Sequence, residues 1–198
     1  MARPRSFDET AVLARVRDAF WSTGYAATSV DELAAAAGLG KGSLYGAFGG
    51  KEDLFRRVFS AYCTELVDAV RARLDGPDSG ALDRVRAQIR AVARATGADA
   101  VMRGCLLSKA TAELSEHDAQ VAATARNTLE AIGALLTRAL AAAQRAGDIS
   151  VEADPQRLAG LLLTVMRGIE ALGKAGTDPE YLRAAAETAL SLLPVTSE

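Results

Sequence analysis

Apolar residues recur every three or four positions along almost the whole chain, and no stretch alternates apolar and polar residues as a half-buried strand would. The sequence between the breaks is rich in Ala, Leu, Arg and Glu. The five prolines, Pro4, Pro77, Pro155, Pro179 and Pro194, all stand where a helix would begin or end. The pattern predicts an all-α fold.

About nine helices follow from this periodicity and its breaks. They are expected at about residues 8–23, 30–37, 41–47, 51–75, 80–96, 103–114, 118–146, 155–175 and 179–193. The last two open with Asp-Pro, so that Asp154 or Asp178 caps the free N–H groups while proline takes the first helical position.

Two other helix starts carry the spacing of a capping box. Ser6 with Glu9 and Ser29 with Glu32 place a hydroxyl and a carboxylate three residues apart, which is the spacing that satisfies two orphan N–H groups. Gly38 is suited to the left-handed residue that ends the second helix.

The chain has 198 residues, of which 49% are apolar and 24% charged, enough for a folded protein of one or two domains. Its longest uncharged stretch is the 12 residues 19–30, against the ~18 or more apolar residues of a membrane-spanning helix. The N-terminal residues lack the apolar segment of a secretion signal. We therefore expect a cytoplasmic protein with no membrane partner.

Few residues suit metal or redox-framework chemistry. Cys63 and Cys105 are the two cysteines and His117 is the single histidine, too few for a disulfide framework or the usual zinc constellations. We expect no metal and no other cofactor. Without a second histidine or a Ser/His/Asp constellation, the residues favour a protein that is not an enzyme.

The formal charge of −2 conceals an asymmetry. Residues 1–57 carry eight Lys or Arg against seven Asp or Glu, whereas residues 58–198 carry 15 against 18. The overall charge therefore does not exclude a nucleic-acid partner for the first part of the chain.

Six glycines punctuate the segment from Gly38 to Gly50. A phosphate-binding nucleotide loop would follow a strand and end in Gly-Lys-Ser/Thr, and this segment does neither. A helix, a short turn with glycine and a second short helix instead predict a helix-turn-helix. Leu44 and Phe48 would anchor the short helix, and five residues would face outward: Lys41, Ser43, Tyr45, Gly46 and Ala47.

The segment from Asp8 to Phe59 resembles the DNA-binding domain of TetR-family transcriptional regulators. The matching motifs are Gly24-Tyr25-Ala26-Ala27-Thr28-Ser29-Val30, Leu33-Ala34, Ala37-Gly38-Leu39, Lys41-Gly42-Ser43-Leu44-Tyr45, Phe48 and Lys51-Glu52-Asp53-Leu54-Phe55. Arg103-Gly104-Cys105-Leu106-Leu107 looks like the effector domain of one subgroup of that family. The resemblance implies an N-terminal helix-turn-helix domain, residues 1–57, and a C-terminal effector and dimerisation domain, residues 58–198.

Roles at the DNA face are carried over from the resemblance. Thr28 and Lys51 match phosphate contacts, and Lys41, Ser43 and Tyr45 match contacts of the recognition helix. Arg3 and Arg5 resemble a basic arm that lies in a minor groove. Gly46 and Ala47 replace the larger side chains common in the family, so base readout is expected to rest on Ser43, the methyl of Ala47 and close backbone approach at Gly46. A packing role for Tyr45 and solvated roles for Lys41 and Lys51 are the alternatives.

An effector pocket is expected among the fourth to eighth helices. The candidates are Phe59, Tyr62, Met102, Cys105, Leu106, Asn127, Met166, Arg167 and Glu170. Trp21 is expected in the core. Cys105 is either a small buried residue or a thiol sensor whose reactive form is favoured by Arg103, Lys109 or Lys174.

Dimerisation is expected through the last two helices, whose apolar faces can form a four-helix arrangement with a second copy. The expected interface residues are Leu158, Leu162, Met166, Ile169, Leu182, Ala189 and Leu193. The leading hypothesis is a homodimeric repressor that reads a palindromic operator in double-stranded DNA and is released by a small-molecule effector. The alternatives are an electrophile- or oxidant-sensing repressor using Cys105, and a helical small-molecule-binding protein or enzyme without specific operator binding.

Overall fold

The computed structural model describes residues 7–196, and this part of the chain is built from nine helices. Their bounds are α1 Glu9–Thr23, α2 Val30–Ala37, α3 Lys41–Phe48, α4 Lys51–Leu74, α5 Ala81–Gly97, α6 Leu106–Leu114, α7 Ala119–Arg145, α8 Pro155–Lys174 and α9 Pro179–Ser191. The all-α prediction is confirmed, and the helix ends lie close to the expected ones.

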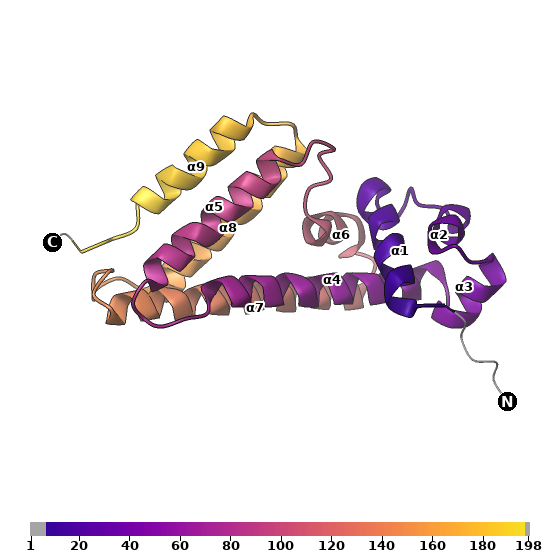
Figure 1. Ribbon diagram of the computed structural model, residues 1–198, viewed down its shortest axis with the longest axis horizontal. Helices are drawn as coiled ribbons and strands as arrows, with labels where there is room; N and C mark the ends of the chain where they lie inside the picture. Colours follow the sequence, from indigo (N-terminus) through magenta and orange to yellow (C-terminus); the bar gives the residue numbers. More distant parts are fainter. Residues whose placement is uncertain (1–6, 197–198) are drawn as a thin grey trace.

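The molecule is elongated (Figure 1). Helices α1–α3 form one end, α5, α8 and α9 gather at the other, and α4 and α7 run along its length with α6 near the middle. The expected division at residues 57 and 58 falls inside the continuous helix α4. None of the helices between residues 7 and 196 has the length and apolarity needed to cross a bilayer.

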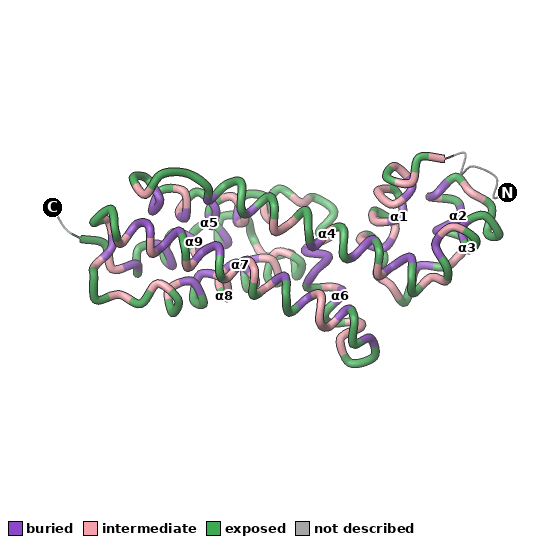
Figure 2. Tube along the Cα trace, turned by 90° about the horizontal axis from the view of Figure 1, so that it is seen from below, coloured by how far each residue is buried: buried purple, intermediate pink, exposed green. Residues whose placement is uncertain are grey.

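Two apolar cores hold this arrangement, and Figure 2 shows the buried positions along the inward faces of the helices. The first core joins the end of α4 with α5, α7, α8 and α9. The second joins α1, α2, α3 and the start of α4 with α6 and the start of α7. Because α4 and α7 contribute to both cores, helices α1–α3 and the body are packed as one structure.

Local capping explains most helix starts. Ser29 and Glu32 form the expected capping box, with Glu32 N–H donating to Ser29 Oγ at 3.2 Å and Ser29 N–H donating to Glu32 Oε2 at 2.6 Å. Asp154 and Asp178 also cap their helices as predicted. At α1 the capping residue is Asp8, whose Oδ1 accepts hydrogen bonds from the N–H groups of Thr10 and Ala11. Ser6, the cap expected from the sequence, lies outside the described residues.

Helix α6 starts three residues later than predicted. Gly104 adopts a left-handed φ of 68° and Cys105 is extended, so residues 103–105 form a connection and not the first turn of the helix. Their backbone groups bond to other segments: Gly104 N–H donates to Asp99 Oδ2 at 3.0 Å, and Gly104 carbonyl accepts from Trp21 Nε1 at 2.7 Å.

Asp118 connects the two long helices. Its side chain accepts hydrogen bonds from the N–H groups of Gln120 and Val121 at the start of α7, and it forms an ion pair with Arg56 Nε of α4 at 2.9 Å. Burial by itself raises the pKa of Asp118, but these bonds outweigh burial and hold the pKa below its ordinary value.

We expect Asp118→Ala to lower the free energy of unfolding by about 2 kcal/mol, because both a helix cap and a partner of Arg56 are lost. Urea denaturation measures this. Asp154→Ala is the matched control, since Asp154 caps α8 through the same two N–H positions without a cross-helix partner, and its loss should be about 1 kcal/mol.

The depressed pKa also sets the pH dependence of this stabilisation. It is fully present above the ordinary value of 3.8 and is lost as the pH falls through the lower folded value. Equal losses in the two variants at neutral pH would contradict a role for the Arg56 pair.

Candidate DNA-binding face and effector cavity

Helices α2 and α3 are joined by the short turn at residues 38–40, in which Gly38 adopts the left-handed φ of 65° that the sequence predicts. Leu44 and Phe48 are buried and hold α3 on the neighbouring helices. The opposite face of α3 is open to solvent. It presents Lys41, Ser43, Tyr45 and Gly46 as exposed residues, with Ala47 half-buried beside them.

Two lysines frame this face. Lys41 Nζ forms an ion pair with Asp31 Oδ1 of α2 at 2.7 Å, and both side chains are exposed. Lys51 Nζ lies 4.5 Å from the centre of the Tyr25 ring, at the first residue of α4. A cation at a helix N-terminus favours phosphate, since the helix dipole has the same sign there.

The glycines of α3 leave the exposed face nearly flat. Apart from the backbone of its own helix, a Cβ added at Gly42 or Gly46 would meet no atom of the described residues within 4 Å. Packing within the chain therefore gives no reason for glycine at either position, although glycine inside a helix costs about 0.5–1 kcal/mol relative to alanine. A surface that comes very close to this face is a physical reason for keeping glycine there.

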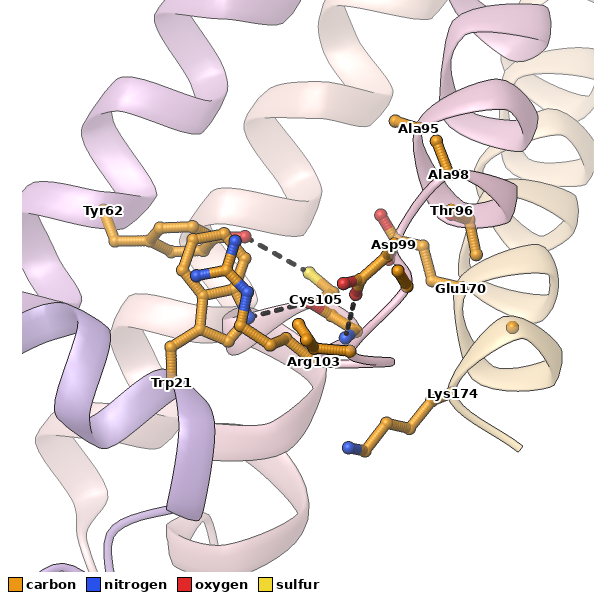
Figure 3. Close-up of a pocket in the computed structure, with 14 residues that line it drawn as sticks. Trp21, Tyr62, Ala95, Thr96, Ala98, Asp99, Arg103, Cys105, Glu170 and Lys174 are labelled. Carbon is orange, nitrogen blue, oxygen red and sulfur yellow. Dashed lines mark hydrogen bonds between the residues drawn. The ribbon is translucent and has the colours of Figure 1, made fainter. Parts of the chain in front are cut away.

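A cavity of about 470 Å³ lies where α1, α4, α5 and α8 meet the connection at residues 98–105 (Figure 3). It is lined by Trp21, Tyr62, Ala95, Thr96, Ala98, Asp99, Ala100, Val101, Arg103, Gly104, Cys105, Glu170, Gly173 and Lys174. In Figure 3, Trp21 and Tyr62 lie on one side and Glu170 and Lys174 on the other, with Cys105 between them. The lining combines aromatic rings with both signs of charge.

Cys105 is buried at the wall of this cavity between three polar groups. Its Sγ lies 3.5 Å from the Tyr62 hydroxyl and 3.4 Å from a terminal nitrogen of Arg167. The same nitrogen pairs with Glu170 Oε2 at 2.7 Å. Burial raises the pKa of Glu170, an effect that Arg167 opposes. Burial, with Cys105 beside it, also raises the pKa of Tyr62, so this hydroxyl stays protonated and can donate to sulfur.

The cavity wall is bonded directly to the end of α1. Besides the Trp21 bond to Gly104, the guanidinium of Arg103 lies 4.7 Å from the centre of the Trp21 ring. Lys109 Nζ of α6 donates to the carbonyls of Trp21 and Ser22 at 2.9 and 3.3 Å. One wall therefore belongs both to the cavity and to the support of α1–α3, which carry the candidate DNA-binding face and are called the DNA-end helices below.

Glu113, one turn after Lys109 on α6, binds the turn that follows α1. Its Oε2 accepts hydrogen bonds from the N–H groups of Tyr25 and Ala26 at 2.8 and 3.3 Å. A Cβ at Gly24, where φ is 92°, would lie 2.3 Å from the Glu113 carboxylate. Gly24 is thus required both for its backbone conformation and for this close approach.

The sequence model described as "Bacterial regulatory proteins, tetR family" matches residues 12–58, and the one described as "Tetracyclin repressor-like, C-terminal domain" matches residues 81–189. The chain belongs to the TetR family. Together the two models match both the helix-turn-helix and most of the helical body.

The similarity to named relatives extends over almost the whole of this chain. The repressor ComR of Escherichia coli (strain K12) is 28% identical over 192 residues, 97% of this chain and 91% of ComR. A cysteine mutant of the TetR-family regulator CifR, complexed with a 26-bp double-strand operator DNA, is 30% identical and covers 98% of this chain and 100% of its own, with a TM-score of 0.84. The reduced form of Escherichia coli NemR shares the fold, with a TM-score of 0.80 at 20% identity, covering 95% of this chain and 97% of its own. The protein is a DNA-binding transcriptional regulator.

The structure places one of the expected DNA contacts, Thr28, differently. Thr28 is buried, and its hydroxyl donates to the Gly24 carbonyl at 2.5 Å and lies 2.6 Å from Thr23 Oγ1. Its side chain stabilises the turn after α1 and is not presented to phosphate. Arg3 and Arg5 lie outside the described residues.

The effector residues expected from helix phase divide into two groups. Tyr62, Cys105 and Glu170 line the cavity, as does Lys174. Arg167 does not line the cavity but contacts Cys105, which does. The other predictions are wrong for this cavity: Phe59, Leu106 and Met166 are core residues, Met102 is exposed, and Asn127 borders a separate groove between α4 and α7.

Sequence reasoning missed Trp21, Asp99 and Arg103 as cavity residues. Trp21 is half-buried at the cavity instead of lying in the core, because its indole N–H takes the Gly104 carbonyl as a partner. The signal that could have found it is chemical: a packed tryptophan needs an acceptor, and the break around Gly104 supplies one.

Most of the expected interface residues are buried within the protomer. Leu162, Met166, Ile169, Leu182, Ala189 and Leu193 all pack into the body, and Leu158 is half-buried. The strongest apolar stripe of each helix thus faces its own chain. Outward-facing apolar residues are Leu161 and Leu172 on α8 and Tyr181 on α9, with exposed fractions of 44%, 42% and 61%.

We expect Gly46→Ala to stabilise the protein by about 0.5–1 kcal/mol, since alanine relieves the helical cost of glycine without a clash, and to weaken operator binding roughly tenfold by blocking close approach. Thermal unfolding and a mobility shift measure the two effects.

Gly133→Ala in α7 is the matched control, because its added methyl meets only Leu163 Cδ2 at an ordinary 3.8 Å. It should stabilise the protein and leave DNA binding unchanged. Tight operator binding by Gly46→Ala would show that α3 does not approach DNA through Gly46.

Proposed function

We propose that this TetR-family regulator is a homodimeric repressor that leaves a palindromic operator when a small molecule occupies the cavity beside Cys105. The observation that carries this proposal is the shared wall: Gly104 borders the cavity and accepts the Trp21 hydrogen bond from α1. A ligand that moves this wall changes the support of the helix-turn-helix. The names of ComR, a repressor, and of the operator-bound CifR support the same direction of regulation.

The cavity offers polar groups that a ligand can use. Nε of Arg103, which lines it, is buried without a hydrogen-bond partner among the described residues. Burying such a donor without an acceptor is costly. Trp21 and Tyr62, whose ring centroids are 5.2 Å apart, supply an aromatic wall beside it. A small molecule with an aromatic or flat apolar part and a hydrogen-bond acceptor fits this lining.

The operator contacts belong to the same proposal. Lys41, Ser43, Tyr45, Gly46 and Ala47 provide the groove-facing surface of α3, and Lys51 provides a phosphate contact at the start of α4. Two copies place two such helices on the half-sites of a palindrome.

The second copy is expected to dock on the outward face of α8 and α9. Leu161, Val165 and Leu172 recur at spacings of four and seven along α8, and Leu161 and Leu172 are exposed. Such a stripe suits helix packing against a symmetry-related copy. This face replaces the buried stripe expected from the sequence. The matched relatives are named as transcriptional regulators, which favours this function over an enzyme or a binding protein without DNA.

The test measures two things separately: whether a ligand binds the protein, and whether its binding weakens the affinity for operator DNA. Small molecules that raise the melting temperature are identified first and then tested for release of DNA from upstream of the protein's own gene. We expect them to weaken operator binding by roughly 5- to 150-fold. In Glu113→Ala the ligand should still raise the melting temperature, because Glu113 does not line the cavity, but the weakening of operator binding should shrink several-fold.

Glu116→Ala is the control, since Glu116 is exposed just beyond α6. It should behave as wild type. Ligands that bind the cavity and leave operator affinity unchanged would refute release by an effector, whereas an undiminished response in Glu113→Ala would refute transmission through α6.

A second candidate function rests on the surroundings of Cys105. The guanidinium of Arg167, 3.4 Å from Sγ, is a suitable partner for a thiolate. The cations expected from the sequence have other bonds: Lys109 holds the end of α1, and Lys174 Nζ donates to the Met102 carbonyl at 2.5 Å. We propose that reaction of Cys105 with an oxidant or electrophile is an alternative way of moving the cavity wall. Membership of a subgroup defined by the Arg-Gly-Cys-Leu motif stays a prediction.

Cys63 supplies an internal comparison. Burial raises the pKa of its thiol to about 11, which leaves almost no thiolate near neutral pH. We expect iodoacetamide to modify Cys105 at least tenfold faster than Cys63, as followed by mass spectrometry. Alkylation should release DNA from wild type and from Cys63→Ser, but not from Cys105→Ser. Equal release from both variants would contradict sensing by Cys105.

A further inference from the structure

A second hollow, of about 330 Å³, lies where the end of α4, the 75–80 connection, the start of α5 and the last third of α7 meet. We call it the arginine hollow, and it is lined by Arg71, Leu74, Asp75, Gly76, Asp78, Arg84, Leu135, Arg138, Ala139, Ala142 and Arg145. It shares no lining residue with the cavity beside Cys105. A ligand here is therefore separate from the effector.

Two of its arginines are fixed by hydrogen bonds. Arg84 donates to the carbonyls of Leu74, Pro77 and Ser79, which hold its guanidinium against the end of α4. Gly76 permits this approach, because an added Cβ would lie 3.0 Å from the guanidinium carbon of Arg84.

Arg145 is also oriented in advance. It pairs with both carboxylate oxygens of Asp78, through Nε at 2.8 Å and a terminal nitrogen at 3.0 Å. The pair lowers the pKa of Asp78, so this carboxylate is charged at neutral pH. One terminal nitrogen of Arg145 remains without a hydrogen bond to the described residues.

The other two arginines have unused donors. Arg71 pairs with Asp68, outside the hollow, through one terminal nitrogen only. Arg138 is exposed and forms no hydrogen bond or ion pair with another described residue. Guanidinium groups with free forks are the side chains best suited to bind carboxylate or phosphate.

Charge and polarity favour an anion with more than one negative charge. Four arginines face two aspartates in the lining, in a part of the chain where residues 58–198 as a whole are acidic. The floor is apolar and buried, made by Leu135, Ala139 and Ala142. A dianion neutralises the excess charge, while a short carbon skeleton covers the floor.

We propose that the arginine hollow binds a small organic polyanion that carries two or more carboxylate or phosphate groups. Arg138 and Arg71 close on the anion from α7 and α4, and Arg145 contributes its free nitrogen. Asp78 competes with the ligand for Arg145 and sets an upper limit on the affinity.

Citrate and pyrophosphate serve as separate probes for a carboxylate or a phosphate ligand. Binding of each is measured by calorimetry at low ionic strength, in a buffer free of other polyanions, with the full-length protein. We expect at least one probe to bind wild type, and Arg138→Gln to weaken that binding about tenfold or more, as loss of a charge-assisted contact does. Arg126→Gln is the matched control, because Arg126 is exposed on the same helix, outside the hollow.

Asp78→Asn is a second variant whose expected effect is a gain in affinity, which a misfolded protein would not show. Removing the competing carboxylate frees Arg145, so binding should become several-fold tighter. The proposal is overturned if neither probe binds wild type, if Arg126→Gln and Arg138→Gln lose affinity equally, or if Asp78→Asn binds no more tightly.

Discussion

The placement of the helix-turn-helix on the body depends on hydrogen bonds at the end of α1. They come from α6 and from the connection before it. Lys109 binds the carbonyls at the C-terminal end of α1, where the helix dipole favours a cation. Glu113 binds the N–H groups of the turn that follows, and Trp21 reaches back to Gly104. These contacts join segments that lie more than 80 residues apart in the chain, and they sit on an apolar core that α6 shares with the DNA-end helices. Without them, α6 and the DNA-end helices would be joined by apolar packing alone.

The polar bonds at the end of α1 and the apolar cores on either side of them differ in how easily they are displaced. The bonds that join the end of α1 to α6 and to the connection before it are few and polar, and one of them, from Trp21 to Gly104, lies at the wall of the cavity. Polar contacts of this kind are directional and are broken by small displacements. The apolar cores on either side are close-packed and change shape less readily. Under the proposed mechanism, movement imposed at the cavity would therefore concentrate at these polar bonds.

The helices could be predicted because their signals are local. Ser29, Asp154 and Asp178 cap within three residues of themselves, and Leu44 and Phe48 lie one turn apart on α3. The start of α6 could not be found in this way, since Gly104 takes its partners from Asp99 and Trp21. Periodicity identified the apolar stripes of α8 and α9, but it does not say whether a stripe faces its own chain or another copy. The cavity was found only in part for the same reason: helix phase does not reveal which residues a loop will bring together.

The continuity of α4 through both cores restricts how such regulators can be recombined. A fragment that ends at residue 57 would leave Leu54 and Phe55 without the apolar residues of α6 and α7 that complete their core. A chimaera that gives this DNA-reading end a new sensor must therefore carry α6 and the start of α7 with it, or replace their packing surface. The segments that must be exchanged together are neighbours in the folded protein but are separated from one another in the gene.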